Sequence, residues 1–147
     1  SSAIATYGGV NKVAPVLAGF FLFAVMSAIA LPGLASFVGE FLVLLGAFAR
    51  YVVVAVIATL GIVLAAAYGL RLYQKVATGP ESPHVMGMTD LRGREVTSLV
   101  PIVLLTLVLG VFPAPVLNVV NPAVDRVMDS IGMTDPAPAL APAGGEQ

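Results

Sequence analysis

The sequence predicts an all-α transmembrane fold with three membrane crossings, the first a broken helix, followed by a short amphipathic C-terminal helix. The chain has 147 residues, of which 59% are hydrophobic and only 10% are charged. Soluble domains usually carry about 25% charged residues. Long apolar stretches alternate with short clusters of charge, and a Pro-Gly pair interrupts the first stretch. These observations together favour membrane helices over a soluble core.

Composition also excludes several classes of function. The net charge of −1 gives no reason to expect nucleic acid or a strongly charged partner. The absence of Cys excludes disulfides, iron–sulfur clusters and thiolate zinc, and the single His excludes a two-histidine haem site within this chain. We therefore expect neither a metal nor a cofactor here. Because the chain opens at Ser1-Ser2 rather than Met, we expect a piece of a longer polypeptide.

The first apolar segment, 14–49, follows a lead-in over 1–13 that we expect to be cytoplasmic. As one straight helix it would be about 54 Å long at 1.5 Å per residue, against roughly 30 Å of hydrocarbon. It is therefore either a tight hairpin or one crossing made of two half-helices. Pro32 disfavours helix at the residue before it, and Gly33 has the φ freedom that a break needs. We favour the broken crossing, because halves of about 17 residues are short for full spans.

Glu40 is the only charged residue between Lys12 and Arg50. A carboxylate inside a membrane is costly, so it usually persists because it moves an ion or a proton, or because it pairs with another helix. A broken membrane helix is tolerated only where the freed backbone faces protein or water. A carboxylate beside such a break indicates an ion pathway, with structural pairing as the alternative interpretation.

The second crossing is predicted over 52–73 and the third over 95–114, joined by a loop over 74–94. The loop and its flanks carry four basic residues, whereas the connection between the first two crossings offers only Arg50. The four are Arg71, Lys75, Arg92 and Arg94. By the positive-inside rule the loop is cytoplasmic and the C-terminus lies on the outer face.

Small and hydroxyl side chains within the crossings predict packing or proton transfer. Gly61, Ala65 and Gly69 recur at four-residue steps, which suits the close approach of a neighbouring helix from the surrounding membrane assembly. Four hydroxyl residues could line a proton wire, although helical hydroxyls often bond their own backbone. They are Ser27, Ser36, Thr59 and Tyr68.

The segment 115–131 is predicted to form an amphipathic interfacial or docking helix. Asn121 has the side chain of a helix N-cap and Pro122 suits the first helical position. Valines repeat at three- and four-residue steps, opposite a charged face. The remaining residues, 132–147, are rich in Pro, Ala and Gly, which predicts a disordered tail.

The stretch Leu-Pro-Gly-Leu-Ala-Ser-Phe-Val-Gly-Glu-Phe-Leu, residues 31–42, resembles the broken twelfth helix of the NuoM-type M subunits of respiratory complex I. These are antiporter-like, proton-translocating membrane subunits. Tyr7-Gly8-Gly9 followed by Pro15 is similar to the approach to that helix, and residues 110–117 are similar to the end of the family's last helix. The resemblance covers residues 7 to about 131 and matches only the last three transmembrane helices of the family.

This resemblance implies the C-terminal part of a proton-translocating subunit of NADH:quinone oxidoreductase, with Glu40 relaying protons and no redox site in this chain. It implies a multi-pass protein of the bacterial inner membrane, whose partners are lipid, protons, other complex I membrane subunits and the remaining helices of the same subunit. One alternative is a related multi-subunit cation/proton antiporter or membrane-bound hydrogenase, where the corresponding residue is more often Lys. A passive membrane scaffold is another, and it predicts that Glu40 can be replaced without loss.

Overall fold

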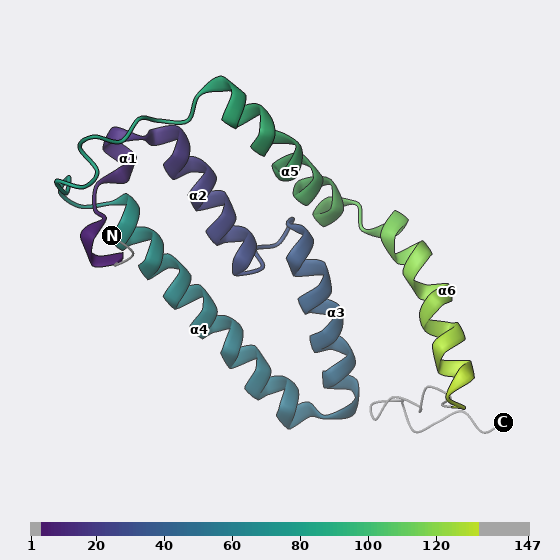
Figure 1. Cartoon of the computed structure of the whole chain (residues 1–147). Helices are drawn as coiled ribbons and strands as arrows, with labels where there is room; N and C mark the ends of the chain where they lie inside the picture. Colours follow the sequence, from purple (N-terminus) through teal and green to yellow (C-terminus); the bar gives the residue numbers. More distant parts are fainter. Residues whose placement is uncertain (1–3, 133–147) are drawn as a thin grey trace.

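The computed structural model describes residues 4–132, and all regular structure in that range is helical, which confirms the predicted all-α class. The predicted tail, 132–147, lies outside the described residues except for Gly132. A short 3₁₀ helix, η1 (Ile4–Thr6), precedes the α-helices of this range (Figure 1). They are α1 (Val10–Val13), α2 (Pro15–Ala28), α3 (Ala35–Arg50), α4 (Val52–Ala77), α5 (Gly93–Val111) and α6 (Ala114–Ser130).

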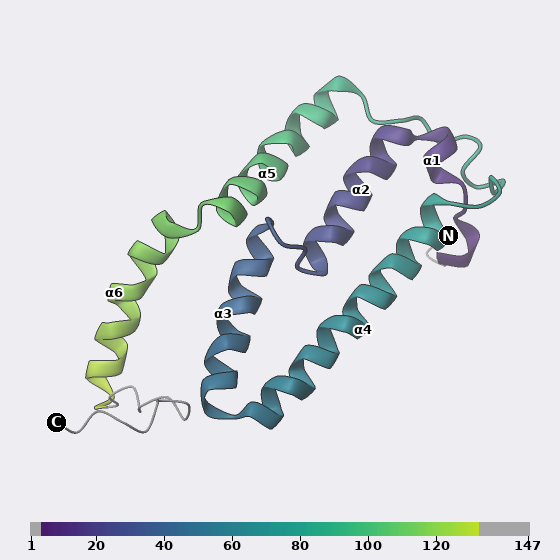
Figure 2. The same cartoon turned by 180° about the vertical axis from the view of Figure 1, so that it is seen from behind.

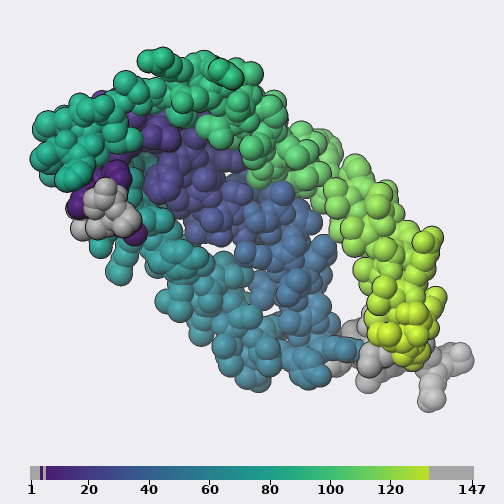
Figure 3. All heavy atoms as spheres, viewed as in Figure 1, coloured from purple at the N-terminus to yellow at the C-terminus, as the bar shows by residue number. Residues whose placement is uncertain are grey.

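The helices form an open, flat bundle. α2 and α3 follow one another in roughly the same direction, and α4 returns along both of them (Figures 1 and 2). α5 lies on the side away from α4, and its C-terminal end reaches the start of α3. α6 continues beyond α5 and stands apart from α3, with none of its own residues buried (Figure 3).

Two helices of the described range are long and apolar enough to cross a membrane. They are α4, with 26 residues, and α5, with 19 residues. α2 and α3 have 14 and 16 residues, which at 1.5 Å per residue makes each shorter than the roughly 30 Å of hydrocarbon. That α2 and α3 together form one broken crossing therefore stays a prediction.

A small core lies at the end of the bundle where the 78–92 loop folds back on the N-terminal segment. Its buried members are Val10, Ala14, Ala18 and Val85. Three hydrogen bonds tie the loop to the N-terminal segment there. Gly9 N–H donates to the Thr78 carbonyl at 3.1 Å, and Ser82 donates from its N–H to the Gly8 carbonyl at 3.2 Å and from its hydroxyl to the Thr6 carbonyl at 2.7 Å. This end of the bundle is therefore held by contacts within the chain.

Elsewhere the large apolar side chains are mostly exposed. Val53 and Leu64 of α4, for example, are 73% and 68% exposed. Fully burying a side chain of this size is worth about 1.5–3 kcal/mol. Extended apolar faces of this kind mark contacts with membrane or protein, in agreement with the predicted membrane environment.

α6 begins one residue before the predicted segment 115–131, but not at the cap that the sequence indicated. The expected start signal at Asn121 and Pro122 is wrong, because α6 begins at Ala114, after Pro113 at its N-cap. Pro115 lies in the first turn, where its missing N–H has no helical partner to lose. Pro122 instead lies inside the helix, where its ring removes one backbone hydrogen bond.

α5 also begins before the predicted boundary. Two hydrogen bonds between Arg92 and Glu95 close its first turn: the Arg92 N–H donates to Glu95 Oε2 at 2.8 Å, and the Glu95 N–H donates to the Arg92 carbonyl at 2.9 Å. Because the helix starts at Gly93, Pro101 lies more than two turns inside it. The helix then ends at Val111, before Pro113.

Asp90 connects the 78–92 loop to the start of α2. Its two carboxylate oxygens accept hydrogen bonds from the Val16 and Leu17 N–H groups, each at 3.0 Å, and one of them also accepts from the Leu91 N–H at 2.8 Å. A carboxylate is well suited to this position because it satisfies free N–H groups and complements the positive end of the helix dipole. Partial burial raises the pKa of Asp90. The hydrogen bonds from the three N–H donors together lower it by more, so the pKa lies below its ordinary value.

We expect Asp90→Asn to loosen the first turn of α2 at neutral pH. The side-chain nitrogen of Asn replaces one carboxylate oxygen and cannot accept a hydrogen bond from the Val16 or Leu17 N–H. Amide hydrogen exchange in this turn measures the effect. The ionised carboxylate stabilises the fold above its unfolded pKa of about 3.8, and this contribution is lost as the pH falls through the lower folded pKa. The difference between variant and parent should therefore shrink at acid pH. Asp125→Asn on exposed α6 is the control, and equal exchange in the Asp90 variant and the parent would contradict the prediction.

Candidate functional site

The break between α2 and α3 begins with a Schellman motif that ends α2. The Leu31 N–H donates to the Met26 carbonyl and the Ala30 N–H donates to the Ser27 carbonyl, both at 3.1 Å. Ala30 has φ 53°, the left-handed conformation that this motif requires and that Gly usually provides. Together with the bond from the Ile29 N–H to the Val25 carbonyl, these bonds pair three carbonyl groups of the last turn of α2 within the chain.

A second turn follows immediately. Leu31 to Leu34 form a β-turn with Pro32 at its second position, Gly33 with φ 96° at its third, and a 3.1 Å bond from the Leu34 N–H to the Leu31 carbonyl. This is the pattern of a type II turn, which needs positive φ at its third position. The irregular stretch thus lies at 29–34, and it contains Pro32 and Gly33, the two residues predicted to break the helix.

Ser36 ties the two sides of the break together. Its hydroxyl donates to the Ser27 carbonyl at 2.5 Å and lies 3.3 Å from the Ser27 hydroxyl. These two residues were predicted as members of a proton wire. The geometry gives Ser36 a structural bond to the backbone of α2. Thr59 likewise donates to the Ala55 carbonyl of its own helix, at 2.9 Å.

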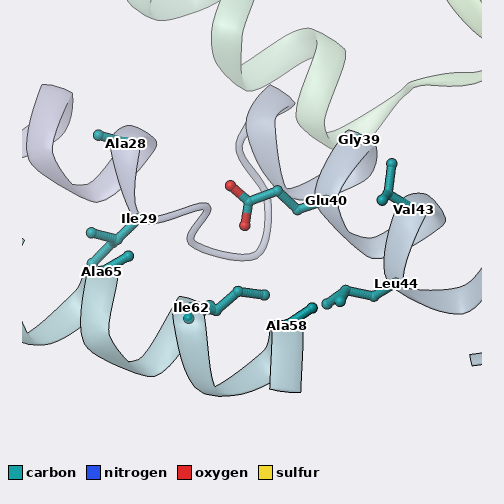
Figure 4. A pocket seen from close by; sticks show the side chains of 10 residues that line it. Ala28, Ile29, Gly39, Glu40, Val43, Leu44, Ala58, Ile62 and Ala65 are labelled. Carbon is teal, nitrogen blue, oxygen red and sulfur yellow. The ribbon is translucent and has the colours of Figure 1, made fainter. Parts of the chain in front are cut away.

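Glu40 lies on α3, little more than a turn after the break, and its exposed side chain lines an open cavity of about 420 Å³ between α3, α4 and the end of α2. Its carboxylate points from α3 into this cavity (Figure 4). The other lining residues are all apolar: Ala28, Ile29, Gly39, Val43, Leu44, Ala58, Gly61, Ile62 and Ala65. Among the described residues Glu40 has no hydrogen-bond or ion-pair partner, so pairing within this part of the chain does not account for it.

A second cavity, of about 500 Å³, lies between α2, α5 and the start of α3. Its polar lining consists of the hydroxyls of Ser27, Ser36 and Thr106, the last of which bonds the Ile102 carbonyl of its own helix. Ala28, the last residue of α2, lines both cavities. The break therefore has a cavity on each side, and only the one facing α4 has a carboxylate in its lining.

The small-residue stripe of α4 faces this chain's own helices. Contact of this stripe with helices of the surrounding assembly stays a prediction, because Gly61 is exposed and has open space beside it. Gly61 and Ala65 line the Glu40 cavity, and buried Gly69 packs against Ile29 at the end of α2. The small side chains leave room beside Glu40 and let α2 approach α4, as expected of small residues between membrane helices.

Three residues that shape the break or the helix leading to it gave little signal in the sequence. Ala30 has no feature that distinguishes it from other alanines, and Asp90 acts on residues more than seventy positions away. Gly110, near the end of α5, touches the backbone of the break, although a Gly inside an apolar helix suggests only close packing in general. Within the described residues there is no group of three or more His, Cys, Asp or Glu side chains that could hold a metal.

Residues 1–65, which include the break and Glu40, match the family model described as NADH:quinone oxidoreductase/Mrp antiporter, transmembrane. The chain is 52% identical over 141 residues to NADH-quinone oxidoreductase subunit M of Mycobacterium tuberculosis (strain ATCC 25618 / H37Rv), covering 96% of this chain and 26% of that protein. It is 41% identical over 126 residues to subunit M of Rickettsia conorii (strain ATCC VR-613 / Malish 7), covering 85% and 26%.

A solved structure agrees with these similarities. A chain in the structure of respiratory complex I from Thermus thermophilus with bound NADH matches with a TM-score of 0.68 and 39% sequence identity. The match covers 76% of the present chain and 23% of that chain. The present chain thus spans about a quarter of the length of the relatives that it matches.

Proposed function

The chain belongs to the family of antiporter-like membrane subunits of NADH-quinone oxidoreductase, and on this premise we propose that it is the C-terminal part of a proton-translocating subunit in which Glu40 relays protons. One observation carries the proposal: the Glu40 carboxylate lies just after a helix break, in a cavity with otherwise apolar walls. A carboxylate in such surroundings is costly unless it has a function.

The relay requires that α2, the break and α3 together form one crossing. Each helix alone is too short for the hydrocarbon, and the two run in the same direction, as halves of one crossing must (Figures 1 and 2). The hydrogen bonds of the Schellman motif, the type II turn and Ser36 satisfy polar groups that a break would otherwise leave free in lipid. Glu40 then lies within the membrane rather than at its surface.

The chemistry asked of Glu40 is simple. A carboxylate accepts a proton on one oxygen, and the resulting carboxyl group donates it to another acceptor. The cavity is large enough to hold several waters, and water in it would reach the carboxylate from the α4 side. The remaining helices of the subunit, other membrane subunits of the complex and lipid would cover the exposed apolar faces, and this chain itself would bind neither NADH nor quinone.

Orientation in the bacterial inner membrane follows from the basic residues. We expect the 78–92 loop to be cytoplasmic and Arg50 to lie on the outer side. In sealed inside-out vesicles, an impermeant thiol reagent should label His84→Cys but not Tyr51→Cys, two exposed positions at opposite ends of the bundle. Labelling of both from the same side would contradict this orientation.

The function itself is tested by NADH-driven proton uptake in membrane vesicles that contain the intact enzyme, with and without Glu40→Gln. The relay requires a group that binds and releases a proton, which Gln cannot do. If an assembled enzyme with Glu40→Gln still pumps fully, only the passive-scaffold interpretation remains. The family model also describes Mrp antiporters, but the relatives named above belong to NADH-quinone oxidoreductase.

A further inference from the structure

Gly110 lies near the C-terminal end of α5 and touches the backbone of the break. A Cβ atom built on it would lie 2.5 Å from the carbonyl carbons of Gly33 and Leu34, and would also collide with the Gly33 carbonyl oxygen. Ordinary van der Waals contacts of a Cβ begin at about 3.4 Å. All three of these atoms belong to the backbone, so no side-chain rotation relieves the contact.

Most other helical glycines of the described chain differ in this respect. A Cβ would meet nothing within 4 Å at five of them: Gly19, Gly39, Gly46, Gly61 and Gly93. At Gly69 it would meet only side-chain atoms, those of Ile29 at 2.8 Å and Val25 at 3.4 Å. Only at Gly110, among the described helical glycines, would a methyl group press on fixed backbone, and this backbone is the type II turn.

The turn cannot move without moving α3. Leu34 is buried and serves as the N-cap residue of α3, and the helix begins at the next residue. Glu40 is on the same continuous helix. A helix hydrogen-bonded throughout transmits a shift of its first turn along its length as a rigid element. The close approach of α5 to Gly33 and Leu34 therefore sets where Glu40 stands relative to α4.

We propose that Gly110 is a positioning residue for Glu40: its missing side chain lets α5 support the break and so fixes the carboxylate in its cavity. The expected effect on pumping rests on the proposed function. The expected effect on the position of α3 relative to α4 does not. Gly110→Ala should displace the start of α3, alter the spacing between α3 and α4, and reduce pumping although Glu40 is still present.

Two measurements on the intact enzyme in membranes test this. The first is the rate of oxidative crosslinking between Leu44→Cys on α3 and Ala58→Cys on α4, two positions whose side chains line the Glu40 cavity and face one another (Figure 4). The second is proton uptake per NADH oxidised, in enzyme without the cysteines. We expect Gly110→Ala to slow the crosslink several-fold and to lower pumping by roughly tenfold, because misplacement by about 1 Å is costly to proton transfer.

Gly93→Ala is the matched control, since it makes the same change in the same helix where a Cβ meets nothing within 4 Å. If Gly110→Ala fails to assemble, Leu107→Ala replaces it, because Leu107 lines a cavity with Gly33 and Leu34 and its truncation adds no atoms. A slowed crosslink in that variant supports the proposal, and a rate equal to that of the control overturns it.

The outcomes separate the inference from the proposed function. If Glu40→Gln abolishes pumping while Gly110→Ala leaves crosslinking and pumping at the level of Gly93→Ala, the positioning role is overturned and the relay stands. If Gly110→Ala slows the crosslink but Glu40→Gln pumps fully, Gly110 positions the side chain and the relay is wrong. A slowed crosslink together with lost pumping in both variants supports both.

Discussion

An intact enzyme with Glu40→Gln should assemble normally and lose most of its NADH-driven proton uptake. Gln has nearly the same size and shape as Glu, so the packing of α3 against α4 should be unchanged. It cannot be ionised, however, and the lining of the cavity contains no other ionisable side chain to take its place. Because a positioned proton-transfer group usually contributes at least about a hundredfold in rate, we expect uptake to fall by roughly tenfold or more.

Controls separate the loss of the proton carrier from damage to the fold. Glu40→Asp keeps an ionisable group but withdraws it by one methylene, so it should retain part of the uptake. Glu81→Gln makes the same chemical change on the exposed loop and should pump normally. Glu40→Ala is less informative because it also removes packing. The amount of assembled enzyme is measured in each membrane, and full uptake by assembled Glu40→Gln enzyme would contradict the relay.

Sequence reasoning located the irregular stretch because three signals agreed there. An apolar segment too long for one crossing contains Pro32, which restricts the backbone, beside Gly33, which permits conformations that other residues avoid. The structure ends α2 slightly earlier than these residues indicate, at Ala28, because Ala30 takes the left-handed conformation. Ala has no preference for that conformation, so the hydrogen bonds of the surrounding motif, rather than the residue itself, determine it.

The start of α6 was harder to predict, because the sequence contains two possible helix starts. Asn121 followed by Pro122 is a good local signal, but Pro113 and Pro115 provide another one seven residues earlier. Proline suits the first turn of a helix in either place. The helix uses the earlier start and tolerates Pro122 inside, a choice that local preferences alone do not decide.

Contacts between distant segments lay beyond sequence reasoning altogether. Asp90 caps α2 across the loop, and Gly110 meets the break from the end of α5. Neither pairing follows from periodicity, because each depends on how the helices are arranged in space. The Glu40 cavity is an intermediate case: the sequence predicted the carboxylate, the break and the small residues of α4, but not that these small residues face the carboxylate.

The conformation of Gly33 should make it the least replaceable residue of the break. Its φ of 96° is required by the type II turn and is disfavoured for residues with a Cβ. A Cβ at this position would meet nothing within 4 Å, so any effect of substitution arises from backbone strain and not from a clash. We expect Gly33→Ala to destabilise the break by about 1–2 kcal/mol and Gly33→Val to do so by more, because β-branched residues are rarer still at positive φ.

The measurements are the amount of assembled enzyme in membranes and the temperature at which the solubilised enzyme loses NADH:quinone turnover. Gly33→Val should lose most of the assembled enzyme. Gly33→Ala should inactivate at a lower temperature than the parent. The inactivation temperature of Gly33→Asn should lie between those of the parent and Gly33→Ala, because Asn tolerates positive φ. Gly87→Val, at an exposed loop glycine without positive φ and with open space around it, should behave as the parent does. Ala30→Gly is the reverse experiment: it relieves left-handed strain at φ 53°, and because Gly also loses more entropy on folding, the net change should be small. If Gly33→Val matched Gly87→Val in assembly and inactivation temperature, the turn would not be needed in the native enzyme, and a relay built on a break held in place at Gly33 would lose its support.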